Sequence, residues 1–350
     1  MSVSMWGESR QYNDDAQRHH LAHELPLPAP YLVHLDPTNL CNFRCPFCPT
    51  GHPELLKAVD RPAGRMDFDL FDKIMNDLLM FPVKPKVLHL YKDGEPLMHP
   101  DFGRMAMLAR IRNVSDRINL TTNAALLTAK RAKEIIAAGI DIVRVSVEHV
   151  HDAGYRERTI TFAKYDTIIR NVAGLFEERE RIGARTRIWV KILRLGLTDE
   201  DIEKFGRDFN RICDDCLVMT PMGWSRTDVY DFTLGSNPTT GDNGETPLRQ
   251  DRVVCPYPFY SLAINFDGSV SVCCADWSHG TVVGNVNTSS LINIWNGSAI
   301  NELRRIHLAN RRAENSACAN CQTMLGLPED SDLDDDRDRL LSLFLGNDSN

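Results

Sequence analysis

The placement of the cysteines is the feature that most constrains this 350-residue chain. Ten cysteines fall into three groups: Cys41, Cys45 and Cys48; Cys213 and Cys216; and Cys255, Cys273, Cys274, Cys318 and Cys321. The segment 1–23 is polar and no long apolar run occurs, so the sequence predicts neither a signal peptide nor a membrane-spanning helix. We therefore expect a cytoplasmic protein with reduced thiols, and metal or iron–sulfur ligation is the first hypothesis for them.

Composition excludes several other classes of protein. With 43% hydrophobic and 25% charged residues, the chain is long and apolar enough to bury a large core. The formal net charge is −8, but segment 329–338 holds seven acids and one arginine. We therefore expect no nucleic-acid partner and no membrane partner, and we interpret the acidic tail as a solvated segment followed by a short docking helix at 340–345.

Strand-like and helical patterns alternate through the first two thirds of the chain. Six runs rich in apolar and β-branched residues predict strands at 31–36, 86–91, 118–122, 140–147, 187–193 and 216–219. The helical patterns between them span 67–81, 100–112, 128–138, 163–181 and 198–212. This order predicts an α/β protein with a parallel sheet, either open or curved toward a barrel, that binds ligands at the carboxyl ends of its strands.

The pattern changes after Gly223. A loop-rich stretch at 235–245 reads as a linker, and Asp267-Gly268 between two apolar runs predicts a β-hairpin. A single helix is expected over 291–308. We predict an N-terminal extension (1–30), a partial barrel (31–222), a linker (223–252), a small C-terminal α+β unit (253–326) and an acidic tail (327–350). A unit of this size needs cross-links such as a metal cluster.

The first cysteine group follows the first predicted strand, where a βα loop brings three thiolates to one point. Three ligands on a four-iron cluster leave one iron open, as catalytic metal sites require. A zinc site with a distant fourth ligand is the alternative reading of Cys41, Cys45 and Cys48.

The arrangement Cys41-x3-Cys45-Pro-Phe47-Cys48 resembles the signature of the radical SAM superfamily. Asp93-Gly94-Glu95-Pro96 resembles the GGEP motif of that family, with Asp93 as the only departure. The resemblance implies a partial (β/α)6 TIM-like barrel, S-adenosylmethionine, and a 5′-deoxyadenosyl radical that abstracts hydrogen from substrate. By resemblance, or by position at the strand ends, the expected cofactor-binding residues are Phe47, Gly94, Glu95, Pro96, Asn123, Ser146, Lys191 and Arg194.

Four cysteines of the last group would fill every ligand position of a metal site with protein thiolates. By resemblance, Cys255, Cys273, Cys318 and Cys321 belong to a twitch unit, the shortened relative of the SPASM domain, and hold an auxiliary 4Fe-4S cluster. No further cysteine follows Cys321, so we expect two clusters in total. A zinc ribbon is the alternative.

Three cysteines remain outside these ligand sets. Cys274 is either a neighbour of the auxiliary ligands without a role of its own or a thiol that quenches a substrate radical. Cys213 and Cys216 have the spacing of a zinc or redox pair, but their place at the start of the sixth strand favours core thiols.

The spacing of the second set resembles that of twitch dehydrogenases acting on aminocyclitols in antibiotic biosynthesis. This implies a radical SAM oxidoreductase that oxidises an alcohol of a small polar substrate, with a flavodoxin- or ferredoxin-type electron donor. Candidate bases after the fourth strand are Glu148, His149 and His151. Epimerisation, decarboxylation, peptide modification and a non-catalytic electron-transfer role remain open alternatives.

Overall fold

The computed structural model describes residues 20–346, and these contain one continuous sheet of nine strands. The strands lie in the order β6-β5-β4-β3-β2-β1-β7-β8-β9. The first six, all parallel to their neighbours, are β1 (Leu32–Leu35), β2 (Val87–His89), β3 (Arg117–Thr122), β4 (Ile142–Val147), β5 (Arg187–Leu193) and β6 (Asp215–Met219). All six predicted strands are confirmed, as is the α/β class.

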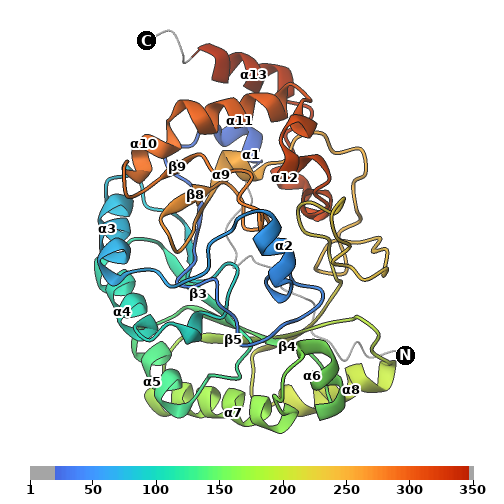
Figure 1. The fold of residues 1–350 in the computed structure, drawn as a ribbon. Helices are drawn as coiled ribbons and strands as arrows, with labels where there is room; N and C mark the ends of the chain where they lie inside the picture. Colours follow the sequence, from blue (N-terminus) through green and yellow to red (C-terminus); the bar gives the residue numbers. More distant parts are fainter. Residues whose placement is uncertain (1–19, 347–350) are drawn as a thin grey trace.

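Five helices follow the outside of the curved row of strands (Figure 1). They are α3 (Phe68–Leu79), α4 (Phe102–Arg112), α5 (Ala129–Ala137), α7 (Tyr165–Ile182) and α8 (Asp199–Phe209). Asp67, Thr128 and Thr198 cap three of them by accepting a hydrogen bond from a first-turn backbone N–H, which explains why these helices begin where they do. Smaller helices are α1 (Leu21–Glu24), α2 (Pro53–Ala58), α6 (Asp152–Thr159), α9 (Tyr257–Tyr260) and α12 (Ser316–Ala319).

The two faces of the parallel sheet differ in chemistry. Because side chains alternate along a strand, Leu88, Leu120 and Val190 share the face toward the helices, and all three are fully buried in the apolar core. The opposite face carries polar residues such as His89 and Arg144, which are also buried. The sheet thus has an apolar outer face that packs against helices and a polar inner face.

The C-terminal unit extends the same sheet instead of standing apart. Strand β7 (Ser261–Ile264) pairs in parallel with β1, while β8 (Ser269–Ser271) and β9 (Gly284–Asn285) continue antiparallel. The predicted hairpin is confirmed between β7 and β8, and Gly268 at its turn has φ +86°, which favours glycine. The segment predicted as a separate small unit therefore borders β1, the strand that precedes the first cysteine group.

The single helix expected over 291–308 is wrong, because the segment forms α10 (Leu291–Trp295) and α11 (Ser298–Leu308). Gly297 stands between them in extended backbone as the N-cap of α11. The break leaves the Trp295 indole N–H to donate to the Leu27 carbonyl at 3.1 Å. It also lets Arg304 lie over the Trp295 ring, 4.3 Å from its centroid. These tertiary contacts outweigh the helical periodicity of the sequence.

The acidic tail is not simply solvated, contrary to expectation. Asp332 pairs with Arg249 and Arg252, and the Asp334 carboxylate accepts hydrogen bonds from the backbone N–H groups of Val253 and Val254 at 3.0 and 2.8 Å. These contacts therefore hold the tail against the end of the linker. The docking helix is confirmed as α13 (Arg337–Gly346), which lies beside α11 in Figure 1.

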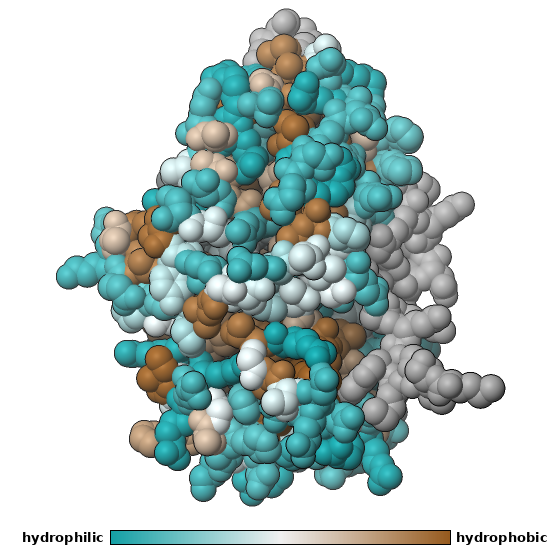
Figure 2. All heavy atoms as spheres, turned by 90° about the vertical axis from the view of Figure 1, so that its right-hand side faces the viewer, coloured by the Kyte–Doolittle hydropathy of each residue, from teal (hydrophilic) through white to brown (hydrophobic). Residues whose placement is uncertain are grey.

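The surface shown in Figure 2 is mostly hydrophilic, with apolar side chains in small separate groups. Among the described residues, every helix is too short or too polar to cross a membrane.

Candidate active site

The first cysteine group occupies a tight loop directly after β1. The Cys48 N–H donates to the Cys45 carbonyl at 3.1 Å, and the Gly51 N–H donates to the Cys48 carbonyl at 2.9 Å. A Cβ on Gly51 would stand 2.2 Å from the Cys45 carbonyl oxygen, so glycine is required for this packing. The Phe43 N–H donates to the Cys41 sulfur at 3.4 Å. Local backbone bonds thus hold the three thiols on one short loop.

Burial makes these thiols weak acids in the absence of a metal. It raises the pKa of Cys41 to about 12 and that of Cys48 to about 11, and it raises the pKa of Cys45 well above its usual value. Cys48 also raises the pKa of Cys41, and Cys48 and Cys41 both raise that of Cys45, as closely placed thiolates do. Cluster binding would therefore release protons and relieve this repulsion, so the donor set fits a cationic iron centre.

Glu95 lies buried beside this loop, with 2% of its surface exposed. Its carboxylate accepts hydrogen bonds from the Leu97 N–H at 3.0 Å, the Thr122 hydroxyl at 2.7 Å and the Asn123 N–H at 2.7 Å. Burial raises its pKa to about 7, and these donors oppose that rise. All its partners are neutral donors, so a ligand ammonium would supply the counter-charge that a buried carboxylate needs.

The neighbours of Glu95 explain the rest of the motif. A Cβ on Gly94 would stand 2.2 Å from the Thr38 carbonyl oxygen, so only glycine fits there. Pro96 begins the short 3-10 helix that Glu95 caps. Asn123 connects the motif to the cysteine loop, because its side-chain amide donates to the Asn42 side-chain oxygen at 2.8 Å and lies 4.0 Å from the Cys41 sulfur.

Glu148 also faces the cysteine loop. It follows β4, is 7% exposed, and adds to the negative surroundings that raise the pKa of Cys45. Burial raises its own pKa to about 7, while Lys191 and Arg158 oppose this. Ser146 and Lys191 are half-buried and lie side by side as register partners on β4 and β5. Phe47 is half-buried against the core.

Three other predicted residues lie elsewhere. A Cβ on Gly154 would stand 2.1 Å from the His149 ring, so this imidazole packs against α6. His151 pairs with Asp201 at 3.2 Å. Arg194 pairs with Asp199 and more than half of its side chain is exposed. The structure does not bring these three together with the cysteine loop.

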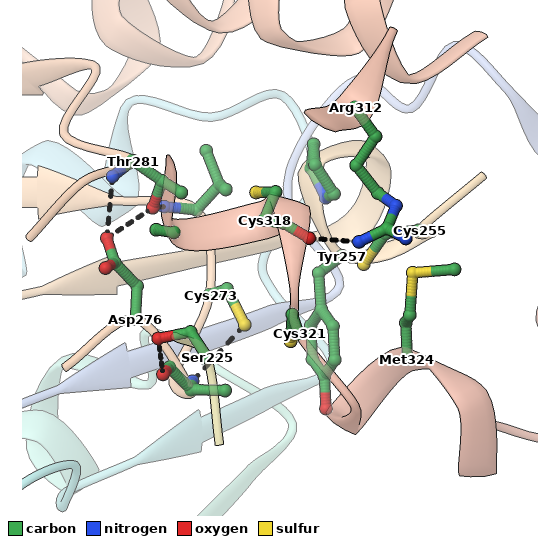
Figure 3. A pocket seen from close by; sticks show the side chains of 14 residues that line it. Ser225, Cys255, Tyr257, Cys273, Asp276, Thr281, Arg312, Cys318, Cys321 and Met324 are labelled. Carbon is green, nitrogen blue, oxygen red and sulfur yellow. Dashed lines mark hydrogen bonds between the residues drawn. The ribbon is translucent and has the colours of Figure 1, made fainter. Parts of the chain in front are cut away.

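The second cysteine set lines one cavity (Figure 3). Cys255 precedes α9, Cys273 follows β8, and Cys318 and Cys321 come from α12 and the turn after it. Burial raises the pKa of Cys255 to about 12. In the described chain, no three His, Cys, Asp or Glu side chains converge on a single-ion position. The four thiols thus line one cavity, as the ligands of one centre would.

Donors surround this cavity as well. The Ala275 N–H donates to the Cys273 sulfur at 3.2 Å, and Arg312 donates to the Cys318 carbonyl. Ser225 of the linker lines the same cavity and donates to the Ala275 carbonyl at 2.8 Å. N–H groups near cluster sulfurs are a feature of iron–sulfur sites.

Cys274 is absent from the side chains that line this cavity. The groups nearest its thiol are first Cys273, which does line the cavity, and then His34 and Lys92, and Tyr91 and Asp242 also lie close to it. Its side chain therefore lies between the second cysteine set and the inner face of the sheet.

A buried charged network between the two cysteine sets escaped the sequence analysis. Arg61 and Lys92, whose side chains are fully buried, both pair with Asp93. Arg61 also donates to the Trp277 carbonyl at 3.1 Å, and Lys92 to the Asp276 carbonyl at 3.3 Å. The residue that departs from the family motif, Asp93, thus anchors the loop of the second set to the first. The signal in the sequence that could have revealed this network is Asp93, which stands where the family motif has glycine.

Cys213 and Cys216 lie at the start of β6, as expected, with their sulfurs 3.3 Å apart and half-buried. Their strand position places them away from the carboxyl end of the sheet.

Comparison with known families agrees with this geometry. The profile described as the Radical SAM superfamily matches residues 35–210, half of the chain. The chain belongs to the radical SAM superfamily. The profile of the SPASM iron–sulfur cluster-binding domain matches residues 255–322. These two domains imply S-adenosylmethionine and 4Fe-4S clusters as cofactors.

Solved structures share the fold at low sequence identity. BtrN in complex with AdoMet and 2-DOIA has a TM-score of 0.52 and 17% identity, covering 86% of this chain and 97% of BtrN. Streptococcus suis SuiB bound to the precursor peptide SuiA has a TM-score of 0.62 and 14% identity, covering 88% of this chain and 73% of SuiB. Native anSMEcpe with bound AdoMet has a TM-score of 0.57 and 12% identity, covering 90% of this chain and 97% of anSMEcpe.

Curated relatives match over shorter stretches. The tungsten-containing aldehyde ferredoxin oxidoreductase cofactor-modifying protein of Pyrococcus furiosus is 34% identical over 116 residues, covering 33% of this chain and 30% of that protein. The GTP 3′,8-cyclase of Staphylococcus aureus is 27% identical over 181 residues, covering 49% and 48%. The chain thus spans half or less of these relatives.

Proposed function

We propose that this radical SAM enzyme oxidises an alcohol of a small polar molecule, a sugar or aminocyclitol, to a ketone. The observation that carries the proposal is the closed set of four cysteines around one cavity. An electron acceptor needs no open iron, whereas a centre that binds substrate does. The similarity in fold to BtrN, a radical SAM dehydrogenase, supports the same reaction.

The oxidation removes one hydrogen atom from the carbinol carbon, one proton from its hydroxyl and one electron. When bound, S-adenosylmethionine on a three-cysteine cluster would supply the hydrogen-abstracting radical, and an auxiliary cluster would supply the electron acceptor. Cys41, Cys45 and Cys48 would hold the first cluster, and Cys255, Cys273, Cys318 and Cys321 the second. An external flavodoxin- or ferredoxin-type protein would supply the initiating electron.

The residues around the first set have distinct roles in this proposal. Glu95 would bind the methionyl ammonium, because it is a buried carboxylate held by neutral donors. Gly94 and Pro96 would shape that site, and Asn123 would fix its distance from the cysteine loop. Phe47, Ser146 and Lys191 would line the cofactor. Glu148 would take the hydroxyl proton, since a carboxyl with a pKa of about 7 is suited to general-base catalysis near neutral pH.

A deuterium label tests this reaction. With deuterium on the carbinol carbon of the substrate, we expect the label in 5′-deoxyadenosine, and an unlabelled substrate should give a product about two mass units lighter. Mass spectrometry of both products checks this. A product of unchanged mass would contradict the proposed oxidation.

Epimerisation is the second candidate, and the position of Cys274 favours it specifically. Its thiol is not among the cavity side chains and shares surroundings with His34 and Tyr91 on the inner face of the sheet. A thiol there would return a hydrogen atom to the substrate radical, which leaves the product isobaric, and the resulting thiyl radical would take one electron by way of the auxiliary cluster and one proton from solvent. In heavy water an epimerised product would gain one solvent deuteron, and Cys274→Ala would abolish its formation.

A further inference from the structure

We infer that His34, His89 and Asn119 form a binding wall for adjacent hydroxyl groups of a polyol, with or without an amino substituent. The inference rests on the proposed function, since it identifies the substrate class and the residues that would hold it. The three residues are called the polar row below.

The strand register places the polar row side by side. His34 of β1 pairs with His89 of β2, and His89 pairs with Asn119 of β3. The flanking residues Leu88 and Leu120 belong to the helix-covered core. Because side chains alternate along a strand, the polar row points to the inner face. The His34 and His89 rings stack with centroids 4.7 Å apart, so their edges are held in a fixed orientation.

Burial without partners is the second observation. The three side chains are between 3% and 5% exposed. Nδ1 of His89 and Oδ1 of Asn119 lack a hydrogen-bond partner, and neither ring nitrogen of His34 has one beyond the neighbouring Cys274 thiol. An unsatisfied buried polar atom destabilises the folded state, so a group of such atoms on one short stretch of sheet indicates a surface that pairs with something else.

The chemistry of these atoms favours hydroxyl groups over an anion. Asn119 Oδ1 is an acceptor only, and a neutral imidazole offers one donor and one acceptor. Burial and the neighbouring His34 and Arg144 lower the pKa of His89, which keeps it neutral. A hydroxyl both donates and accepts, so it can satisfy each of these atoms, whereas a carboxylate or phosphate would leave Asn119 Oδ1 without a donor.

The polar row also borders the reactive side of the sheet. Tyr91 lies edge-on to both imidazoles, with its centroid 6.0 Å from that of His34 and 4.8 Å from that of His89. The thiol of Cys274 is adjacent to His34. A polyol held by the polar row would therefore lie at the carboxyl ends of β1 and β2, between the two cysteine sets.

The test is anaerobic calorimetric titration of the cluster-loaded enzyme with S-adenosylmethionine present. The probes are myo-inositol and D-glucosamine as polyols, citrate as an anion, and triglycine as a peptide. We expect a polyol to bind, and His34→Phe and His89→Phe each to weaken that binding about tenfold. The matched control is His307→Phe, because His307 is also a buried histidine with two unpartnered ring nitrogens but lies on α11.

Iron content and reductive cleavage of S-adenosylmethionine report whether each variant is intact. If the His34→Phe variant fails to bind iron, His34→Gln replaces it in the test. This variant keeps a polar side chain, so it should bind the polyol more weakly than the unaltered enzyme but more tightly than a phenylalanine variant. Failure of both polyols to bind, tighter binding of citrate or triglycine, or equal weakening by His307→Phe would overturn the inference. The proposed oxidation fails separately, if a bound polyol that depends on His34 yields no ketone.

Discussion

The two cysteine sets differ in how the chain brings their thiols together. Cys41, Cys45 and Cys48 lie within one loop that local hydrogen bonds fix. The other four are spread from Cys255 to Cys321 and meet only because β8, α9 and α12 fold around one cavity. A local set keeps its shape when distant parts change, whereas a dispersed set depends on the fold of its whole unit. The predictions below test that difference.

The largest effect is expected from removing the first set. Replacing Cys41, Cys45 and Cys48 together by alanine should abolish cleavage of S-adenosylmethionine and leave about half of the iron, because the two sets share no ligand. Iron and sulfide analysis with chromatography of 5′-deoxyadenosine checks this. Retention of all the iron would contradict the assignment of this loop.

Removing the second set should affect the fold more than the chemistry of cofactor cleavage. In Cys255→Ala/Cys318→Ala we expect about half of the iron, persistent cleavage of S-adenosylmethionine and no ketone product. We also expect the free energy of unfolding to fall by several kcal/mol, since ligand binding and folding are coupled in a dispersed site. Metal analysis and thermal unfolding measure these effects.

The matched control is Cys213→Ser/Cys216→Ser, which removes a pair of thiols at the start of β6. It should keep all the iron. Loss of iron from this control would extend ligation to the third cysteine group.

Substitution of Glu95 tests whether cofactor binding at the first cysteine set depends on one residue outside the cysteine loop. Glu95→Gln should weaken binding of S-adenosylmethionine by about tenfold to a hundredfold, because a charged hydrogen bond to the ammonium becomes a neutral one. Iron content should not change. Equilibrium binding measures the loss, and Glu54→Gln, an exposed carboxylate on α2, is the control. Equal weakening in the control would contradict the role of Glu95.

A further effect is expected in the pH dependence of stability of the metal-free protein. Burial raises the pKa of both Glu95 and Glu148 to about 7, above the ordinary glutamate value of 4.5. The folded state therefore binds more protons than the unfolded state between these values, so stability should fall as pH rises from about 4.5 to about 7. The expected contribution is on the order of a few kcal/mol.

Denaturant unfolding at several pH values checks this dependence. Glu95→Gln/Glu148→Gln should flatten the slope in that range. If the double variant leaves the slope unchanged, titratable groups other than Glu95 and Glu148 cause the pH dependence of stability.

Much of the fold and the site was predictable from local sequence. The six strands of the barrel follow from runs of apolar and β-branched residues, and Asp267-Gly268 predicts the hairpin because that dipeptide suits its turn. Cys41, Cys45 and Cys48 stand out by their spacing, and Gly94-Glu95-Pro96 by its resemblance to a motif of the radical SAM superfamily. These features depend on residues close in sequence, which act before any tertiary contact forms.

Only the tertiary structure decided the remainder. Strand β7 pairs with β1, and Asp332 pairs with Arg249 and Arg252, so both features join residues far apart in the chain. The break at Gly297 accompanies a contact of the same kind, between Trp295 and Leu27. The polar row likewise needs the register of three strands. Periodicity in one segment shows which face of a strand is apolar, but which strands become neighbours, and so which polar groups meet, depends on the packing of the whole chain.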